Sequence, residues 1–141
     1  MIALHLLSFS LLQYFAMPTN LGHRVLPCLL VSEMRRSLDF YMGMLGFTQT
    51  GYYPIESNPT RTEVRRDDVA IILYTEQVRS SDRPPAFTGA LYVFPKSIET
   101  LADELRGKVP FAWGPENTDF GIREFAIRDP DGYTLVFAER A

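Results

Sequence analysis

The residue types that most often do chemistry in proteins are scarce in this chain. It has two histidines, His5 and His23, and one cysteine, Cys28. A bound transition metal needs several nitrogen, carboxylate or thiolate ligands at one place. One cysteine can form neither a thiolate cluster nor an intramolecular disulfide. The glycines follow no phosphate-binding pattern, and no GxSxG sequence marks a serine nucleophile. The chemistry that remains is that of binding.

Aromatic and charged side chains are the candidates for binding. Tyr92 and Phe94 alternate onto one face of an expected strand, and Trp113, the only tryptophan, ends another strand beside a glycine. Phe120 lies in the loop 116–121, which we expect to act as a lid. The alternative is core packing for the aromatic residues and solvated positions for the arginines. The expected ligand-binding residues are Arg65, Tyr92, Phe94, Trp113, Phe120, Arg123 and Glu124.

A hairpin near the C-terminus sets which of these residues share a face. The turn Asp-Pro-Asp-Gly at 129–132 is flanked by two apolar runs and suits a type I turn followed by a left-handed glycine and a bulge. This turn pairs Ile127 with Leu135 and Phe125 with Phe137, on the face that meets the helices. Glu124 then lies on the other face.

The chain contains one internal repeat, which predicts two modules of the order strand-helix-strand-strand-strand. In the first, strand 25–31 is followed by an N-cap at Ser32 and a helix that ends at Gly46. In the second, strand 91–94 is followed by an N-cap at Ser97 and a helix that ends at Gly107. The remaining strands are expected at 47–53, 60–66, 69–75, 109–113, 122–128 and 133–139.

Length and composition indicate one globular domain. The chain has 141 residues, 46% hydrophobic and 22% charged, with a formal net charge of -3. No basic patch stands out, so nucleic acid is not an expected partner. The lone cysteine fits a reducing cytoplasm. The Pro- and Ser-containing segment 76–87 links the modules, which we place at 24–76 and 88–140 within a domain 21–141.

The first residues, MIALHLLSFSLLQYFA, are nearly all apolar. This run is shorter than the roughly 20 residues of a membrane span, and no Lys or Arg precedes it as in a secretory signal. A second methionine, Met17, begins the globular pattern. We interpret residues 1–20 as an N-terminal extension which, if ordered, forms a helix that covers an apolar surface, with a secretory signal as the alternative. We expect no membrane association.

Three features of the sequence carry a resemblance to a known family. They are the repeated unit, the segment SLDFYMGMLGF at 37–47 and the segment REFAIRDPDG at 123–132. These features resemble the vicinal oxygen chelate superfamily, which includes glyoxalase I, extradiol dioxygenases and bleomycin resistance proteins. The resemblance covers residues 24–140. It implies an α+β fold in which two βαβββ modules form curved mixed sheets around a cleft. The motif is specific to the superfamily but not to one function.

The metal enzymes of this superfamily carry four ligands on the inner sheet face. Matching their motifs to this chain gives Leu26, Leu73, Ala90 and Val136 as the corresponding positions. None of these side chains can ligate a metal. The resemblance therefore implies a protein without a metal and without another cofactor.

Three functions are compatible with this reading. The first is a metal-free binding protein similar to the bleomycin resistance proteins, which sequesters a planar or cationic ligand such as an antibiotic in the cleft of a homodimer and is not an enzyme. The second is a metal-dependent lyase, isomerase or dioxygenase with ligands from other positions. The third is a small regulatory or structural domain without a ligand.

Overall fold

The computed structural model describes residue 22 and residues 24–75 and 86–140. The expected N-terminal helix and most of the linker 76–87 lie outside these residues. The first module consists of β1 (Cys28–Leu30), α2 (Met34–Leu38), the π-helix η1 (Asp39–Met44), β2 (Thr48–Tyr53), β3 (Arg61–Arg66) and β4 (Val69–Tyr74). The second consists of β5 (Ala90–Val93), α3 (Ile98–Leu105), β6 (Phe111–Asn117), β7 (Ile122–Arg128) and β8 (Thr134–Arg140).

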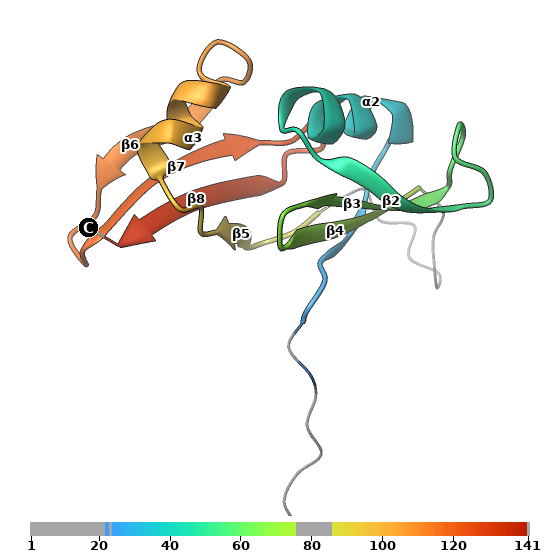
Figure 1. The fold of residues 1–141 in the computed structure, drawn as a ribbon, viewed down its shortest axis with the longest axis horizontal. Coiled ribbons are helices and arrows are strands. Elements are labelled where there is room, and N and C mark those ends of the chain that lie inside the picture. The colour runs from blue at the N-terminus through green and yellow to red at the C-terminus, as the bar shows by residue number, and fades with distance from the viewer. Residues whose placement is uncertain (1–21, 23, 76–85, 141) are drawn as a thin grey trace, which may run out of the picture.

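Each module forms its own mixed sheet. The strand orders are β1-β4-β3-β2 and β5-β8-β7-β6, and the first strand of each module runs parallel to the last. Figure 1 shows α2 and α3 on the same side of the two sheets. The predicted α+β architecture of two βαβββ modules is confirmed. No helix in the described part of the chain is long and apolar enough to cross a membrane.

The helix-covered sides of both sheets meet in one hydrophobic core. In the second module Phe125, Ile127, Leu135 and Phe137 are all buried in it. Phe125 pairs with Phe137 and Ile127 with Leu135, as the turn type predicts. Gly132 has a φ of 87° in the turn, a conformation that glycine adopts without steric cost. In each sheet, the side opposite the helices is called the open face below, because no helix of the described residues covers it.

The helix of the first module begins one residue later than predicted. Its N-cap is Glu33, which makes no side-chain capping bond, so the N-cap prediction at Ser32 is wrong. The Ser32 hydroxyl is used elsewhere and donates to Asp131 across 2.6 Å. The prediction for the second module is confirmed, because Ser97 Oγ accepts from the Thr100 N–H.

The predicted face of Leu73 is also wrong. Leu73 is fully buried in the helix-side core together with Val64, and Ile72 takes the open face. Cys28 precedes the N-cap Glu33 by the same five residues that separate Tyr92 from Ser97. Cys28 pairs with Ile72 as Tyr92 pairs with Val136, so the counterpart of Val136 is Ile72. A one-residue error in the repeat offset exchanges the two faces of a strand.

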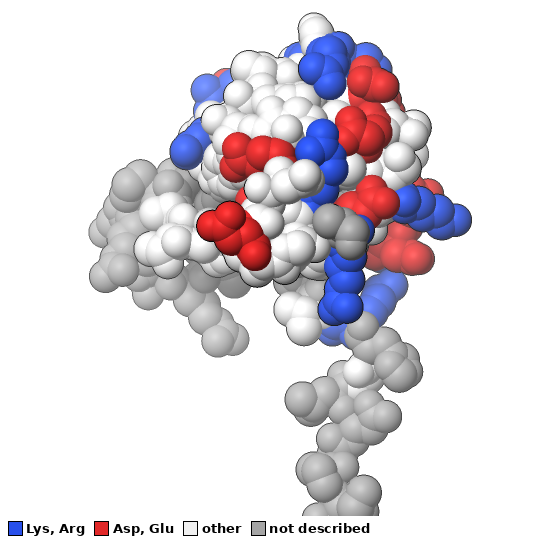
Figure 2. All heavy atoms as spheres, turned by 90° about the vertical axis from the view of Figure 1, so that its left-hand side faces the viewer, with Lys and Arg blue, Asp and Glu red and all other residues white. Residues whose placement is uncertain are grey.

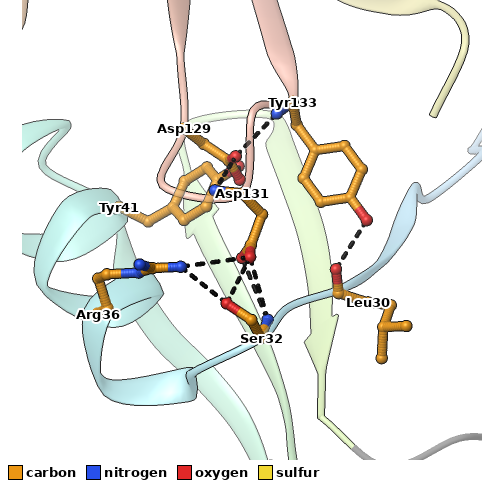
Figure 3. Close-up of polar contacts among 7 residues, drawn as sticks. All are labelled: Leu30, Ser32, Arg36, Tyr41, Asp129, Asp131 and Tyr133. Atoms are coloured by element: carbon orange, nitrogen blue, oxygen red, sulfur yellow. Dashed lines mark hydrogen bonds and ion pairs between the residues drawn. The ribbon is translucent and has the colours of Figure 1, made fainter. Parts of the chain in front are cut away.

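The β7–β8 turn connects the second module to the first (Figure 3). The buried carboxylate of Asp129 accepts from the Tyr41 hydroxyl of η1 at 2.9 Å and from the N–H groups of Asp131 and Tyr133. The Tyr133 hydroxyl donates to the carbonyl of Leu30 at 2.7 Å. This set of contacts is called the turn joint below.

Asp131 completes the turn joint on its exposed side. Its carboxylate accepts from the N–H and the hydroxyl of Ser32 and lies 3.4 Å from the Arg36 guanidinium. The Asp-Pro-Asp-Gly turn of the second module is thus a structural connection between the modules.

Burial is the largest influence on the pKa values of Asp129, Tyr41 and Tyr133 in the turn joint. It raises the pKa of Asp129, although the hydrogen bonds from Tyr133 and Tyr41 oppose this rise. Burial and the neighbouring Asp129 carboxylate also raise the pKa of Tyr41, and burial raises the pKa of Tyr133 to about 12. Both tyrosines therefore remain hydroxyl donors at neutral pH.

Removing the Tyr41 hydroxyl tests the turn joint. We expect Tyr41→Phe to lower the free energy of unfolding by about 1–3 kcal/mol, because Asp129 loses a buried donor to its carboxylate. The measurement is urea unfolding followed by circular dichroism. Tyr74→Phe is the matched control, since no hydrogen bond of the Tyr74 hydroxyl is found among the described residues, and it should cost less than about 0.5 kcal/mol. Equal losses in the two variants would contradict the assignment.

Candidate functional site

A row of side chains crosses the open face of the second sheet. Tyr92 pairs with Val136, Val136 with Ala126, and Ala126 with Trp113, so the row runs through all four strands. The two central residues are small or medium-sized and buried, while the aromatic residues stand at the two ends. The centre of the row is closed, with Ala126 0% and Val136 1% exposed, so its accessible surface lies at the two aromatic ends.

Glu124 lies between the two aromatic residues. Glu124 lies two residues before Ala126 in β7, so the two side chains share one face of the strand. Glu124 is paired with Ala138 of β8. Its carboxylate accepts from Trp113 Nε1–H at 3.2 Å and from the Tyr92 hydroxyl at 3.3 Å. Glu124 is only 7% exposed, and no cation forms an ion pair with it in the described residues. Tyr92, Trp113 and Glu124 are called the carboxylate cluster below.

The chemistry of the carboxylate cluster favours a cationic guest. The hydrogen bond from Trp113 lies at the long end of the usual range and the one from Tyr92 lies beyond it. A carboxylate has about four acceptor sites, of which two are used here. Glu116 is paired in register with Glu124 across β6 and β7, which adds a second negative charge nearby. Desolvation and then the charge of Glu124 raise the pKa of Tyr92, so its hydroxyl stays protonated and donating.

A close backbone approach positions Trp113. The β6–β7 register shifts on both sides of Trp113, and Gly114 follows with a φ of 76°. A Cβ at Gly114 would collide with the carbonyl oxygen of Glu124 and lie 2.8 Å from the Cα of Phe125. Only glycine permits this contact, and the bulge directs the indole toward the Glu124 carboxylate. The sequence showed the glycine beside Trp113, but the close approach requires the strand register.

The expected binding residues do not all come together. Phe94 adjoins Tyr92, with ring centroids 6.3 Å apart, and is 69% exposed. Phe120 is 71% exposed in the short turn between β6 and β7, where the Thr118 N–H bonds to the Ile122 carbonyl. This turn is shorter than the expected lid, because residues 116 and 117 belong to β6.

Neither arginine reaches the carboxylate cluster. Arg123 extends to the opposite side of β7, where it forms an ion pair with Glu99 of α3 and a 3.2 Å hydrogen bond with Asn117. Arg65 lies in β3 of the other module and donates to Glu63 at 2.8 Å. That hydrogen bond is the main cause that lowers the pKa of Glu63. Strand alternation alone separates Arg123 from Glu124.

The corrected positions of the superfamily's metal ligands also carry no ligating side chains. Leu26, Ile72, Ala90 and Val136 offer no nitrogen, sulfur or carboxylate oxygen. Among the described residues, no group of three or more His, Cys, Asp or Glu side chains could hold a metal ion.

The surface charge of the second module is mixed. Figure 2 shows basic and acidic side chains interspersed on that face of the molecule, with no extended patch of either sign. Such a surface exerts no strong long-range field on a charged ligand, so recognition depends on groups within the site.

Paired βαβββ modules, each with one sheet face open, define a class of small α+β proteins. The sequence signature of the Glyoxalase/Bleomycin resistance protein/Dioxygenase superfamily matches residues 20–137. The chain therefore belongs to this superfamily. No curated protein sequence matches it.

Solved structures agree with this fold. A superfamily member from Sphaerobacter thermophilus matches with a TM-score of 0.72 at 22% identity, covering 85% of this chain and 98% of that one. TnmS3, an antibiotic binding protein from Streptomyces sp. CB03234, matches with a TM-score of 0.71 at 22% identity, covering 88% and 100%. TioX from Micromonospora sp. ML1 matches with a TM-score of 0.72 at 13% identity, covering 85% and 100%.

Substitution of Gly114 tests the close approach that positions Trp113. We expect Gly114→Ala to lower the free energy of unfolding by about 2–5 kcal/mol, because it adds a backbone collision to the cost of a positive φ. Gly121→Ala is the matched control, since Gly121 has a φ of 78° but nothing within 4 Å of the added Cβ. It should cost only about 1–2 kcal/mol. Chemical unfolding of both variants measures the difference, and equal costs would contradict a specific contact at Gly114.

Proposed function

We propose that this protein is a metal-free binding protein that sequesters a planar, cationic small molecule on the open face of its second module. The observation that carries the proposal is the buried Glu124 carboxylate, which accepts from Tyr92 and Trp113 and has no cationic partner among the described residues. An aromatic cation would stack on the two rings and place its charge at the carboxylate.

Burial makes Glu124 more consistent with binding than with a purely structural role. A carboxylate removed from water is costly unless it is paired and hydrogen-bonded. Two neutral donors satisfy part of its capacity, and a cation would satisfy the rest. In a partly dry site the same charge gives a stronger interaction with a cationic guest than it would in water.

The superfamily contains binding proteins as well as enzymes. TnmS3 is described as an antibiotic binding protein, and it shares the fold of this chain. This similarity supports an antibiotic-like ligand for this chain.

We also propose that the binding cleft is completed in a homodimer. One βαβββ module covers only one face of its sheet, and the open face carries the exposed Tyr92 and Phe94. A two-fold axis would place the open face of the first module of one copy opposite the second module of its partner. Arg65 and Glu63 of β3 in the second copy would then line the cleft. The expected contact between Arg65 and the ligand would come from that copy.

Glu124 is the first test of this function. We expect Glu124→Gln to weaken binding of an aromatic cation such as ethidium by roughly 10- to 100-fold, because a charge-assisted interaction is lost while the amide keeps hydrogen-bonding capacity. Isothermal titration calorimetry over a panel of aromatic cations, bleomycin-type glycopeptides included, measures the affinities. Glu56→Gln changes an exposed carboxylate outside the site and is the control. Unchanged affinity of Glu124→Gln for every cation that binds would place the site elsewhere.

Oligomeric state tests the second part of the proposal. Light scattering at micromolar concentrations should give the mass of a dimer for the wild type. Phe94→Glu should shift the mass toward a monomer, because it introduces a charge into the apolar open face. Phe120→Glu alters an equally exposed phenylalanine away from that face and should leave the dimer intact. A monomer mass for the wild type would contradict the dimer.

The competing hypothesis is a metal-dependent lyase, isomerase or dioxygenase. We expect elemental analysis of the purified protein to find no stoichiometric transition metal, because the family's ligand positions hold apolar side chains. Dialysis against a chelator should leave binding of the aromatic cation unchanged. About one ion per chain, removed together with an activity, would replace the binding proposal with the enzyme.

A further inference from the structure

A hollow lies between the modules on the helix side of the molecule, away from the carboxylate cluster. Its volume is about 500 Å³, within the range of small-molecule pockets. The first module contributes Leu45, Phe47 and the β3–β4 turn, and the second contributes residues 93–97, one face of α3 and Phe137. Most of its apolar lining belongs to the core side of both sheets, and Phe94, which adjoins Tyr92 on the open face, completes it.

The hollow lies where the β3–β4 turn meets the second module, at the position that corresponds to the turn joint. The contacts that fill the turn joint have no equivalent there among the described residues. At the turn joint, Tyr41 stands eight residues past its helix N-cap and reaches Asp129. Leu105 stands eight residues past the N-cap of α3 and is fully buried along the hollow. It has no aromatic ring to extend across the corresponding space. The β3–β4 turn is also short, since Arg66 pairs with Val69 and only two residues intervene.

Arg66 fixes the edge of the hollow. Its Nη1 donates to the Leu45 carbonyl at 2.7 Å and its Nη2 to Glu104 of α3 at 3.1 Å. These contacts bridge the modules and neutralise the Glu104 carboxylate at this edge. The hydrogen bonds of Arg66 therefore hold the two modules together at this edge of the hollow.

The free charge at the same edge is negative. Asp67 and Asp68 both line the hollow, and no hydrogen bond or ion pair of either side chain is found within the described part of the chain. Asp67 is held at a φ of 51° by the tight turn, so its position is fixed relative to the apolar lining. Lys96 also lines the hollow and is exposed, and its long side chain can extend its ammonium group into solvent.

We propose that this hollow is a second ligand site, and that it takes a bulky apolar amine. The apolar body rests on the half-exposed Val69 and Val93 and on the exposed Phe94 of the lining, and the ammonium group faces Asp67 and Asp68. The site shares no residue with the carboxylate cluster, so it is independent of the ligand site proposed for the open face. An apolar surface with a charged group at its edge gives both affinity and orientation.

A matched pair of probes tests the chemical class. Isothermal titration calorimetry compares 2-naphthylmethylamine with 2-naphthoate, which share a ring system and differ in charge. The amine should bind at least ten-fold more tightly than the carboxylate. The double variant Asp67→Asn and Asp68→Asn should reduce this preference to three-fold or less, and asparagine tolerates the left-handed turn position. Asp119→Asn, an exposed carboxylate in another turn, should leave the preference unchanged.

A filling variant tests the location. Thr100 is exposed on α3 and lines the hollow, so Thr100→Phe should fill the space from outside and weaken amine binding at least ten-fold. Lys108→Phe adds the same side chain outside the hollow and should have no effect, and circular dichroism verifies that both variants fold. Glu124→Gln should leave this binding unchanged. Equal binding of the two probes, or amine binding that is lost in Glu124→Gln but retained in Thr100→Phe, would overturn the second site and leave the open-face proposal standing.

Discussion

The hydrogen bond from the Tyr41 hydroxyl to Asp129 joins the two modules at the point on which the rest of the structure depends. Asp129 also accepts the N–H groups of Asp131 and Tyr133, so one buried carboxylate both shapes the β7–β8 turn and attaches it to the first module. This β7–β8 turn also sets the pairing register of the two strands, which brings Glu124 and Ala126 to the open face of β7. The turn joint and the carboxylate cluster therefore both depend on the same hairpin.

The sequence predicted those elements whose signal is local. The Asp-Pro-Asp-Gly turn and the alternation of apolar residues defined the register of β7 and β8, and this register placed Glu124 correctly on the open face. The bonds of the cluster could not be foreseen, because they depend on a bulge beside Gly114 that changes the direction of Trp113. Bulges are set by pairing with the neighbouring strand, which the sequence of one strand does not contain.

The two errors differ in origin. One offset relates Cys28, Glu33 and Ile72 of the first module to Tyr92, Ser97 and Val136 of the second. An offset wrong by one residue put Leu73 on the open face, although it is buried in the core. It did not change the chemistry at that position, because Ile72 is apolar as well. The role of Ser32 was missed for a different reason, since its partner Asp131 is 99 residues away.

The strongest argument for a ligand is the presence of a charge where a neutral side chain would serve. A glutamine at position 124 could accept from Trp113 Nε1–H through its carbonyl oxygen and donate its amide N–H to the Tyr92 hydroxyl, without the cost of removing a carboxylate from water. A buried charge with only neutral donors destabilises the free protein relative to such an isostere. A cationic guest offsets this cost when it binds, and the binding free energy then includes the relief of the unpaired charge. The carboxylate cluster thus stabilises the complex at the expense of the free protein, as preorganised binding sites do.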